Sequence, residues 1–190
     1  MKTIALYGGS FDPPHLAHEA IVKALRELDF IDKVVVMPTF LNPFKETFTA
    51  PAELRLQWLK DIFSSYEDVQ VSSYEVDLKK KVPTIETVKY LLNSYDKVYL
   101  IIGADNLKSL HQWYKFDALK RVVTFIVVTR DEIAIPKNFI RLDLHEDISS
   151  SDLRKNFDSL KIPKKVRDKI TQYYKEHNAK QNTKNSRYTR

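Results

Sequence analysis

Short apolar runs rich in β-branched residues recur along the chain and alternate with amphipathic stretches. Four of these runs are nearly continuous in apolar residues: Thr3–Tyr7, Lys33–Met37, Val98–Ile102 and Val122–Val128. Such runs are typical of parallel strands that are covered on both faces, since neither face of the strand then has to be polar. This pattern constrains the fold more than any other feature of the sequence.

The stretches between these runs have helical periodicity. Three of them are predicted as helices: Leu16–Leu28, Pro51–Phe63 and Thr84–Leu92. In the first, Ile21, Leu25 and Leu28 recur at helical spacing between charged residues. After Ser149 the pattern becomes wholly helical. Strand and helix thus alternate as in an α/β fold, and we predict a Rossmann-like doubly wound parallel sheet with a helical C-terminal region.

The chain length of 190 residues suits a single domain with a sizeable core. We predict one domain over residues 1–176 and a polar, basic tail over residues 177–190 that we expect to be disordered. The chain has 31 Lys and Arg against 25 Asp and Glu, but residues 161–190 alone hold ten basic and two acidic residues. The basic excess therefore belongs to the C-terminal end, and we predict no nucleic-acid partner.

The absence of cysteine excludes a disulfide scaffold, a thiolate zinc site and a cysteine nucleophile. The first apolar run is too short for a signal peptide. No stretch approaches the roughly 18 apolar residues of a membrane span. We therefore expect a cytoplasmic protein without a membrane partner, or one that is exported without a readable signal.

Glycine is rare, and its positions suggest where a ligand binds. The chain has three glycines, Gly8, Gly9 and Gly103, and all of them directly follow a predicted strand. Glycine serves where the backbone needs positive φ or approaches another group closely. Ligands of open α/β sheets bind at the carboxyl ends of the strands, so we expect the site at this edge.

The segment Gly8–His18 carries the first candidate site. Two glycines allow a tight turn, and Pro13-Pro14 keeps the next residues extended until a helix begins near His15. His15 and His18 are three residues apart, which places both rings on one helix face. Backbone N–H groups at a helix start bind phosphate, and imidazoles can stabilise charge in a transition state. Taken singly, these residues could form an ordinary turn, a surface histidine pair, or half of a metal site without an evident third ligand.

The segment Ile148–Arg154 carries the second candidate site. Ser149, Ser150 and Ser151 precede Asp152 and Arg154 at the start of the C-terminal helical region. Serine is a favoured N-cap and aspartate suits a first turn, so helix capping explains this string on its own. Three hydroxyls and an arginine one turn later also form a clamp for a polyphosphate.

Both segments together resemble the nucleotidyltransferase superfamily with an HxGH motif. Gly9-Ser10-Phe11-Asp12-Pro13 followed by His15-x-x-His18 resembles its first signature, with Ala17 where glycine is usual. The string from Ile148 to Arg154 resembles its triphosphate-binding motif. Members transfer a nucleoside monophosphate from a nucleoside triphosphate and release pyrophosphate.

The middle of the chain resembles one family of this superfamily, the bacterial nicotinate-nucleotide adenylyltransferases. The resemblance rests on Gly103-x-Asp105, on Trp113-Tyr114 and on a later strand that ends at Arg130. The loop Asn42-Pro43-Phe44-Lys45 is similar to the family's Pro-Pro-His-Lys, with Phe44 in place of histidine. Thr84 matches a family threonine, whereas Val82-Pro83 departs from the preceding pair.

The resemblance implies transfer of AMP from ATP to nicotinate mononucleotide, giving deamido-NAD and pyrophosphate in NAD biosynthesis. His15 and His18 are the implied catalytic residues, with His18 at the α-phosphate. The implied ATP-binding residues are Gly8, Gly9, Ser10, Phe11, Gly103, Asp105, Arg130, Ser149, Ser150, Ser151 and Arg154. The implied mononucleotide-binding residues are Lys45, Thr84, Trp113 and Tyr114. Mg²⁺ is expected to bind through the ATP phosphates, without a metal site of protein ligands.

Several alternatives stay open at this point. The acceptor could be pantetheine phosphate, nicotinamide mononucleotide or a cytidylyltransferase substrate, although Trp113-Tyr114 favours a flat aromatic ring. The chain could also be a non-catalytic nucleotide-binding protein, or a nucleic-acid-binding module that uses its basic tail. A homo-oligomer is compatible with the sequence, which does not determine the oligomeric state.

Overall fold

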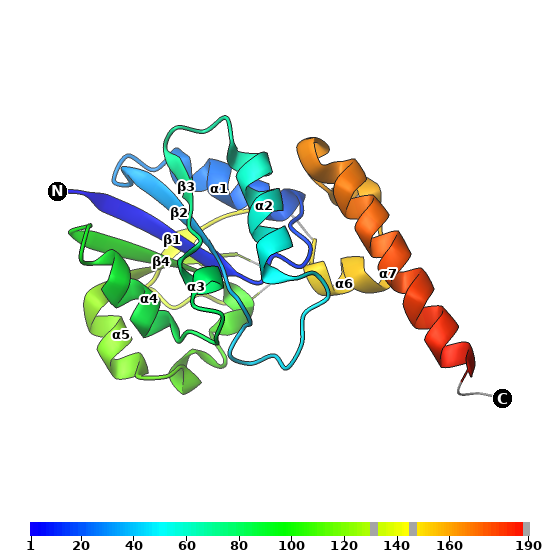
Figure 1. Ribbon diagram of the computed structural model, residues 1–190. Coiled ribbons are helices and arrows are strands. Elements are labelled where there is room, and N and C mark those ends of the chain that lie inside the picture. The colour runs from blue at the N-terminus through cyan, green and yellow to red at the C-terminus, as the bar shows by residue number, and fades with distance from the viewer. Residues whose placement is uncertain (130–132, 145–147, 188–190) are drawn as a thin grey trace.

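A computed structural model describes residues 1–129, 133–144 and 148–187 of the chain, with side chains up to residue 179. Its strands are β1 (Thr3–Gly9), β2 (Lys33–Pro38), β3 (Val69–Val71), β4 (Lys97–Gly103), β5 (Val123–Val128) and β6 (Ile140–Leu142). Within the described residues they form one sheet in the order β3-β2-β1-β4-β5-β6, and every pair is parallel (Figure 1). This is the strand order of a doubly wound α/β fold, and it confirms the predicted fold class.

Helices lie between the strands in the sequence and also follow the last strand. The α-helices are α1 (Leu16–Arg26), α2 (Ala52–Phe63), α3 (Tyr74–Asp77), α4 (Thr84–Leu91), α5 (Phe116–Val122), α6 (Ser150–Lys155) and α7 (Arg167–Arg187). Short 3₁₀ helices are η1 (Ala104–Asn106), η2 (Leu110–Gln112), η3 (Ser159–Lys161) and η4 (Lys164–Val166). None of the helices in the described part of the chain combines the length and the apolar character that a membrane crossing requires.

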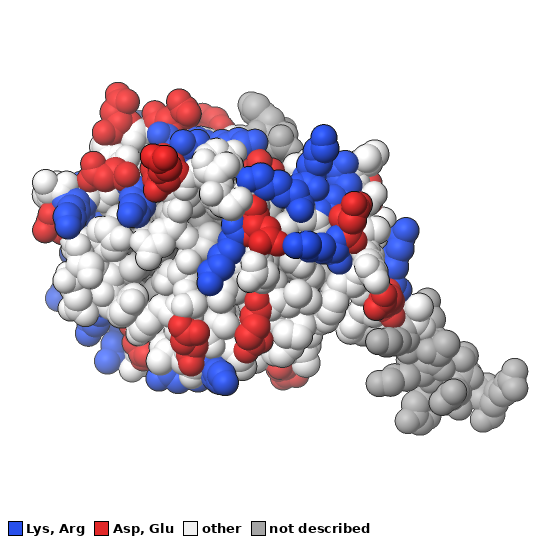
Figure 2. Space-filling model, turned by 45° about the horizontal axis from the view of Figure 1, so that its top comes forward, with Lys and Arg blue, Asp and Glu red and all other residues white. Residues whose placement is uncertain are grey.

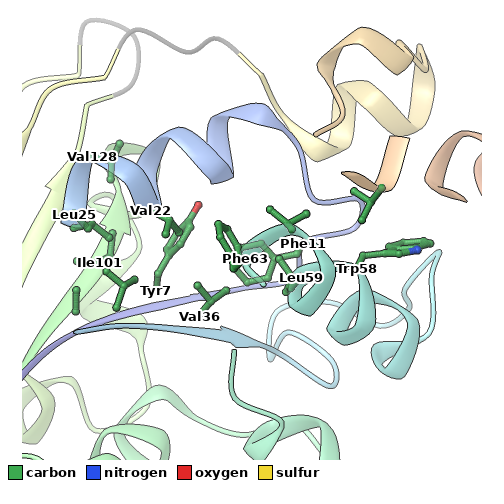
Figure 3. Packing of buried hydrophobic residues seen from close by; sticks show 14 of the residues in the cluster. Tyr7, Phe11, Val22, Leu25, Val36, Trp58, Leu59, Phe63, Ile101 and Val128 are labelled. Atoms are coloured by element: carbon green, nitrogen blue, oxygen red, sulfur yellow. The ribbon is translucent and has the colours of Figure 1, made fainter. Parts of the chain in front are cut away.

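The sheet has a hydrophobic core on each face. Along β1, Ala5 and Tyr7 belong to the core that α1 and α2 cover, whereas Ile4 and Leu6 belong to the core that α4 and α5 cover. Figure 3 shows the first of these cores, in which Phe63 and Leu59 of α2 lie between Tyr7 of β1 and Trp58 of α2. Because both faces of the central strands are buried, their sequences are continuously apolar, which is the pattern that predicted them.

Helix α7 packs against the body by its first turns and then extends away from it (Figure 1). Ile170 and Tyr174 are fully buried in the core that α1 and α2 cover. The sequence predicts disorder from residue 177, but the backbone is helical up to Arg187. The reason is that residues 176–187 contain neither glycine nor proline, so nothing in this stretch stops the helix. The division into one domain over residues 1–176 and a tail stays a prediction.

Acidic and basic side chains are interspersed on the body of the molecule. On the face shown in Figure 2, acidic and basic side chains both occur around a largely uncharged middle, and several basic side chains gather toward the side from which α7 extends. This agrees with the charge count of residues 1–160, which hold 21 basic and 23 acidic residues.

Candidate active site

A cavity of about 440 Å³ opens at the carboxyl ends of β1, β2, β4 and β5. Gly8 and Gly9 at the end of β1 and Gly103 at the end of β4 belong to its wall. This is the edge of the sheet at which the sequence predicts a ligand site. The side chains around the cavity come from the first, middle and last parts of the chain, which the fold brings together.

The turn after β1 is tightly packed around the ring of Phe11. Phe11 has a positive φ of 48°, and its ring lies edge-on to Tyr7 at a centroid distance of 5.4 Å and to His18 at 4.8 Å. A Cβ atom at Gly9 would approach this ring to 3.2 Å. A larger residue at Gly9 would therefore need the Phe11 ring to shift by a few tenths of an ångström, while the positive φ belongs to Phe11.

The histidine pair is fixed at the start of α1. The two rings stack at a centroid distance of 3.6 Å, and the backbone N–H of His15 donates to Nδ1 of His18 at 3.1 Å. Because Nδ1 of His18 accepts this bond, the neutral ring carries its proton on Nε2. Both histidines line the cavity.

The serine string caps α6 and also contacts the first candidate segment. Ser149 is the N-cap of α6, and its hydroxyl accepts from the backbone N–H of Asp152 at 3.0 Å. The hydroxyl of Ser150 donates to the carbonyl of Pro13 at 2.9 Å, across 137 positions in the chain. Ser149, Ser150 and Ser151 all line the cavity. The two motifs are therefore joined directly at one edge of the sheet.

Positive charge collects beside the same turn. The ammonium group of Lys45 lies 3.4 Å from the hydroxyl of Ser10. Burial lowers the pKa of Lys45, the positive charge of Arg154 lowers it further, and the carboxylate of Asp12 acts in the opposite direction. A cation beside a cavity whose pKa is lowered by burial and by a second positive charge favours an anionic ligand.

The middle segment closes another side of the cavity. A Cβ atom at Gly103 would lie 2.4 Å from Oδ1 of Asp105, so no larger residue fits there without displacing the carboxylate. The side-chain amide of Asn106 donates to the carbonyl of Gly103 at 3.3 Å. Trp113 is half-buried and Tyr114 is 56% exposed, and both line the cavity together with Asp105.

The structure brings most of the predicted site residues to one place. The cavity wall contains Gly8, Gly9, Ser10, Phe11, His15, His18, Lys45, Thr84, Gly103, Asp105, Trp113, Tyr114, Ser149, Ser150 and Ser151. Arg154 is not part of this wall. Its guanidinium donates to the carbonyl of Asp12 and to the hydroxyl of Ser151. Arg130 lies outside the described residues.

Arg55 of α2 is a buried residue near the site that the sequence analysis missed. It is 1% exposed, and its guanidinium donates to the carbonyl of Ser10, to that of Ala50 and to those of Thr39 and Phe40, the last three at 2.9 Å. Burial lowers the pKa of Arg55. These bonds hold the turn after β1 against the loop that carries Lys45.

The helical periodicity of the sequence around Arg55 could have indicated that this residue is buried. Arg55 is three residues after Ala52 and four before Leu59, and both of these neighbours are buried. A charged residue at a core position of an amphipathic helix is expected to have buried partners.

Asp12 is a second buried residue to which sequence analysis assigned no role. Its carboxylate accepts from the backbone N–H groups of Thr49 at 2.8 Å and Ala50 at 2.9 Å, and from the hydroxyl of Tyr174. Burial raises the pKa of Tyr174, and the negative charge of Asp12 raises it further. Asp12 therefore ties the first motif to α7, which no local pattern reveals.

Glu75 of α3 is a third missed residue on the cavity wall. It is 5% exposed, and the hydroxyl of Thr87 donates to its Oε1 at 2.6 Å. Burial raises the pKa of Glu75 from 4.5 to about 7, while the bond from Thr87 acts in the opposite direction. The folded protein therefore keeps a proton on Glu75 at pH values where the unfolded chain has lost it.

The buried carboxyl predicts a pH-dependent stability. The protonated carboxyl of Glu75 contributes to the free energy of unfolding. This contribution is fully present below the unfolded pKa of 4.5 and is lost as the pH rises to about 7. Glu75→Gln stays neutral, so we expect it to exceed the wild type by at most about 3 kcal/mol in free energy of unfolding at alkaline pH, with little difference near pH 5. Urea denaturation of both proteins across this range measures the difference, and parallel pH profiles would contradict the assignment.

Comparisons with known proteins agree with this arrangement. The cytidylyltransferase-like family model matches residues 6–156. A protein of Sulfurimonas denitrificans is 56% identical over 95% of this chain and 99% of its own, and one of Campylobacter fetus is 45% identical over 93% and 99%. Both are named as probable nicotinate-nucleotide adenylyltransferases.

A solved structure has the same fold. The nicotinic acid mononucleotide adenylyltransferase of Plasmodium falciparum, in complex with NaAD, superposes with a TM-score of 0.74 at 23% identity, covering 92% of this chain and 98% of that one. At this identity the likeness concerns the fold, whereas the bacterial relatives carry the family assignment. This chain belongs to the cytidylyltransferase-like family and, within it, to the nicotinate-nucleotide adenylyltransferases.

Proposed function

We propose that the protein transfers the adenylyl group of ATP to nicotinate mononucleotide and forms deamido-NAD and pyrophosphate. The observation that carries this proposal is the bond from Ser150 to the carbonyl of Pro13, which joins both phosphate motifs at one cavity. Relatives up to 56% identical bear the name of this activity.

The reaction needs little covalent chemistry from the protein. A phosphate oxygen of the mononucleotide forms a bond to the α-phosphorus of ATP, and the bond from that phosphorus to the oxygen bridging to the β-phosphorus breaks. The attacking phosphate is ionised near neutral pH, so no general base is required. Catalysis then consists of holding two polyanions in line and stabilising charge as the bond breaks.

The residues around the cavity divide into two groups. Gly8–Phe11, Ser149–Ser151 and Arg154 are assigned to the ATP phosphates, with Gly103, Asp105 and Arg130 toward the adenosine half. His15 and His18 are assigned to the reacting phosphates, since both histidines line the cavity beside the turn after β1. Lys45 is assigned to the phosphate of the mononucleotide. Its lowered pKa indicates that its positive charge is poorly stabilised in the protein alone, and a bound anion would stabilise it.

The acceptor half is assigned to Trp113, Tyr114 and Thr84. The indole of Trp113 offers a flat apolar surface for a pyridine ring. Thr84 is the first residue of α4, on the same cavity wall.

Mg²⁺ is proposed to enter with ATP. In the part of the chain that the structure describes, no group of three or more His, Asp or Glu side chains could hold a metal ion. The donors around the phosphates are instead hydroxyls, imidazoles and cations, which fit a metal that is carried by phosphate oxygens. When bound there, the ion neutralises charge on the triphosphate.

Pyrophosphate release tests the proposal. Purified protein is mixed with ATP, Mg²⁺ and nicotinate mononucleotide, and parallel reactions contain nicotinamide mononucleotide or pantetheine phosphate. We expect release with the nicotinate form, much less with the amide, and none when the metal is chelated. Release with pantetheine phosphate alone would reject the acceptor, and silence with all three would reject the activity.

Removal of residues 180–190 is expected to leave turnover within about twofold of the full chain. The anchors of α7, Ile170 and Tyr174, precede the deletion and remain buried. Pyrophosphate release by the shortened protein measures the effect. A large loss of turnover would show that residues 180–190 are needed for activity, and would support a functional role for the basic tail.

A further inference from the structure

The loop that carries Lys45 (residues 39–50) has little regular structure of its own. Residues 43–48 are exposed, and no helix or strand includes them. Asn42 shapes a local turn through its side chain and its carbonyl, but this turn does not fix where the loop lies. Lys45 lines the cavity, with its ammonium group 3.4 Å from the hydroxyl of Ser10. The position of Lys45 therefore depends on how the two ends of the loop are held.

Buried side chains hold both ends of the Lys45 loop. At its start, the guanidinium of Arg55 donates to the carbonyl of Thr39 at 2.9 Å. At its end, the carboxylate of Asp12 accepts from the backbone N–H groups of Thr49 at 2.8 Å and Ala50 at 2.9 Å. Asp12 is 4% exposed, and a hydrogen bond shielded from water in this way is stronger than one at the surface. Asp12 thus ties the end of the loop to the first phosphate motif.

Helix α7 supplies the third donor to this carboxylate. The hydroxyl of Tyr174 donates to Oδ1 of Asp12, across 162 positions in the chain. Tyr174 is 0% exposed, and its ring lies 5.7 Å from that of Phe157 and 6.3 Å from that of Trp58. A phenylalanine ring would make the same apolar contacts, so packing does not require the hydroxyl. The hydroxyl instead fixes the carboxylate, because Oδ1 also accepts from the N–H of Ala50 on a different segment.

We propose that Tyr174 is a positioning residue for adenylyl transfer: through Asp12 it holds the Lys45 loop so that Lys45 meets the phosphate of the mononucleotide. This inference rests on the proposed function. Tyr174 is not part of the cavity wall and acts only through the loop. Displacing a group that binds substrate by about 1 Å can slow a reaction roughly 100-fold, so a hydroxyl outside the cavity can control the rate.

Tyr174→Phe removes the hydroxyl and keeps the ring. The carboxylate of Asp12 then loses one donor and is free to turn, so the end of the Lys45 loop loses a fixed acceptor. We expect kcat/KM for nicotinate mononucleotide to fall about tenfold, the effect of one hydrogen bond to a charged group. The KM for ATP should stay within about twofold, because Arg154 and Ser150 still hold the carbonyls of the first motif. Pyrophosphate release at varied concentrations of each substrate measures both values.

Ile170→Val is the matched control for a structural effect. Ile170 lies one turn before Tyr174 on α7 and is 0% exposed, and the substitution removes a buried methylene without removing a hydrogen bond. It should lower the melting temperature and leave kcat and both KM values within about twofold of the wild type. A purely structural role for Tyr174 predicts the same result for Tyr174→Phe, whereas positioning predicts the selective loss for the acceptor.

A double-mutant cycle tests whether Tyr174 acts through Lys45. Lys45→Ala removes the charge that the loop presents, so we expect it to lower kcat/KM for the mononucleotide. In that background Tyr174→Phe should add less than about a twofold loss, because the group that it positions is gone. Asp12→Asn provides a second break in the same connection, since it keeps an acceptor at Oδ1 but loses the one at Oδ2 for Thr49. We expect the same selective loss from it.

The results that would overturn this inference are distinct. One is an acceptor kcat/KM of Tyr174→Phe within about twofold of the wild type. Another is an equal tenfold loss with and without Lys45, and a third is full activity of Lys45→Ala. If Tyr174→Phe does not fold, the profile of Asp12→Asn decides between the selective loss and none. A wild type that releases no pyrophosphate overturns the proposed function and this inference with it, whereas normal turnover by both loop-end variants overturns this inference only.

Discussion

His18→Ala is expected to slow adenylyl transfer by about 100- to 1,000-fold, which is the loss measured when a preorganised donor to a developing charge is removed. The ring of His18 is fixed on three sides. The backbone N–H of His15 occupies Nδ1 at 3.1 Å, the ring of His15 stacks at 3.6 Å, and the ring of Phe11 lies edge-on at 4.8 Å. This packing fixes the orientation of the imidazole, so the ring does not have to reorient during the reaction.

Single-turnover pyrophosphate release measures this loss, and equilibrium binding of ATP separates it from weakened affinity. We expect ATP binding to survive in part, because the serine string and Lys45 remain. His111→Ala is the matched control, since His111 is exposed and lies outside the cavity wall. An unchanged rate in His18→Ala would reject the assignment to the α-phosphate.

Arg55→Met is expected to reduce the free energy of unfolding by about 4 kcal/mol. The substitution keeps an apolar side chain in the core but leaves the carbonyls of Ser10, Thr39, Phe40 and Ala50 without their donor. Each buried acceptor that loses its partner costs about 1–3 kcal/mol, and some of these carbonyls can regain water. We expect turnover to fall as well, because the turn at Ser10 is no longer held against the loop of Lys45.

Urea denaturation measures the first effect and pyrophosphate release the second. Arg26→Met serves as the control, since Arg26 forms a half-exposed ion pair with Asp68 at 2.7 Å, which contributes at most about 1 kcal/mol. Arg55→Lys keeps the charge but cannot reach all four carbonyls, so we expect an intermediate loss. Equal stability of the Arg55 and Arg26 variants would show that the four bonds contribute little.

The long elements of the fold were predictable because their signal is local. The strands β1, β2, β4 and β5 are buried on both faces and therefore continuously apolar. The strands β3 and β6 have three residues each, too few for a period, and they exist because β2 and β5 offer them hydrogen-bonding partners. The helical backbone of residues 177–187 was missed because polar composition was given more weight than the absence of helix breakers.

Some features of the candidate site could likewise be predicted from the sequence, and others could not. The turn at Gly8–Phe11, the histidine pair and the serine string are each contiguous, so their chemistry can be read from a few neighbouring residues. Their roles at the phosphates stay predictions, although the structure places them on one cavity wall. The positive φ of the turn was not readable, since it falls on Phe11 rather than on a glycine.

The sequence alone determined the α/β fold class, the edge of the sheet at which the cavity lies, and the two candidate phosphate motifs, because periodicity and motif spacing depend on residues close together in the chain. Only the tertiary structure decided which distant groups meet: Ser150 with Pro13, Tyr174 with Asp12, and Thr87 with Glu75. It also decided the protonation of Glu75 and the buried position of Arg55. Burial and dielectric surroundings set these properties, and they arise when segments far apart in the chain close around one cavity.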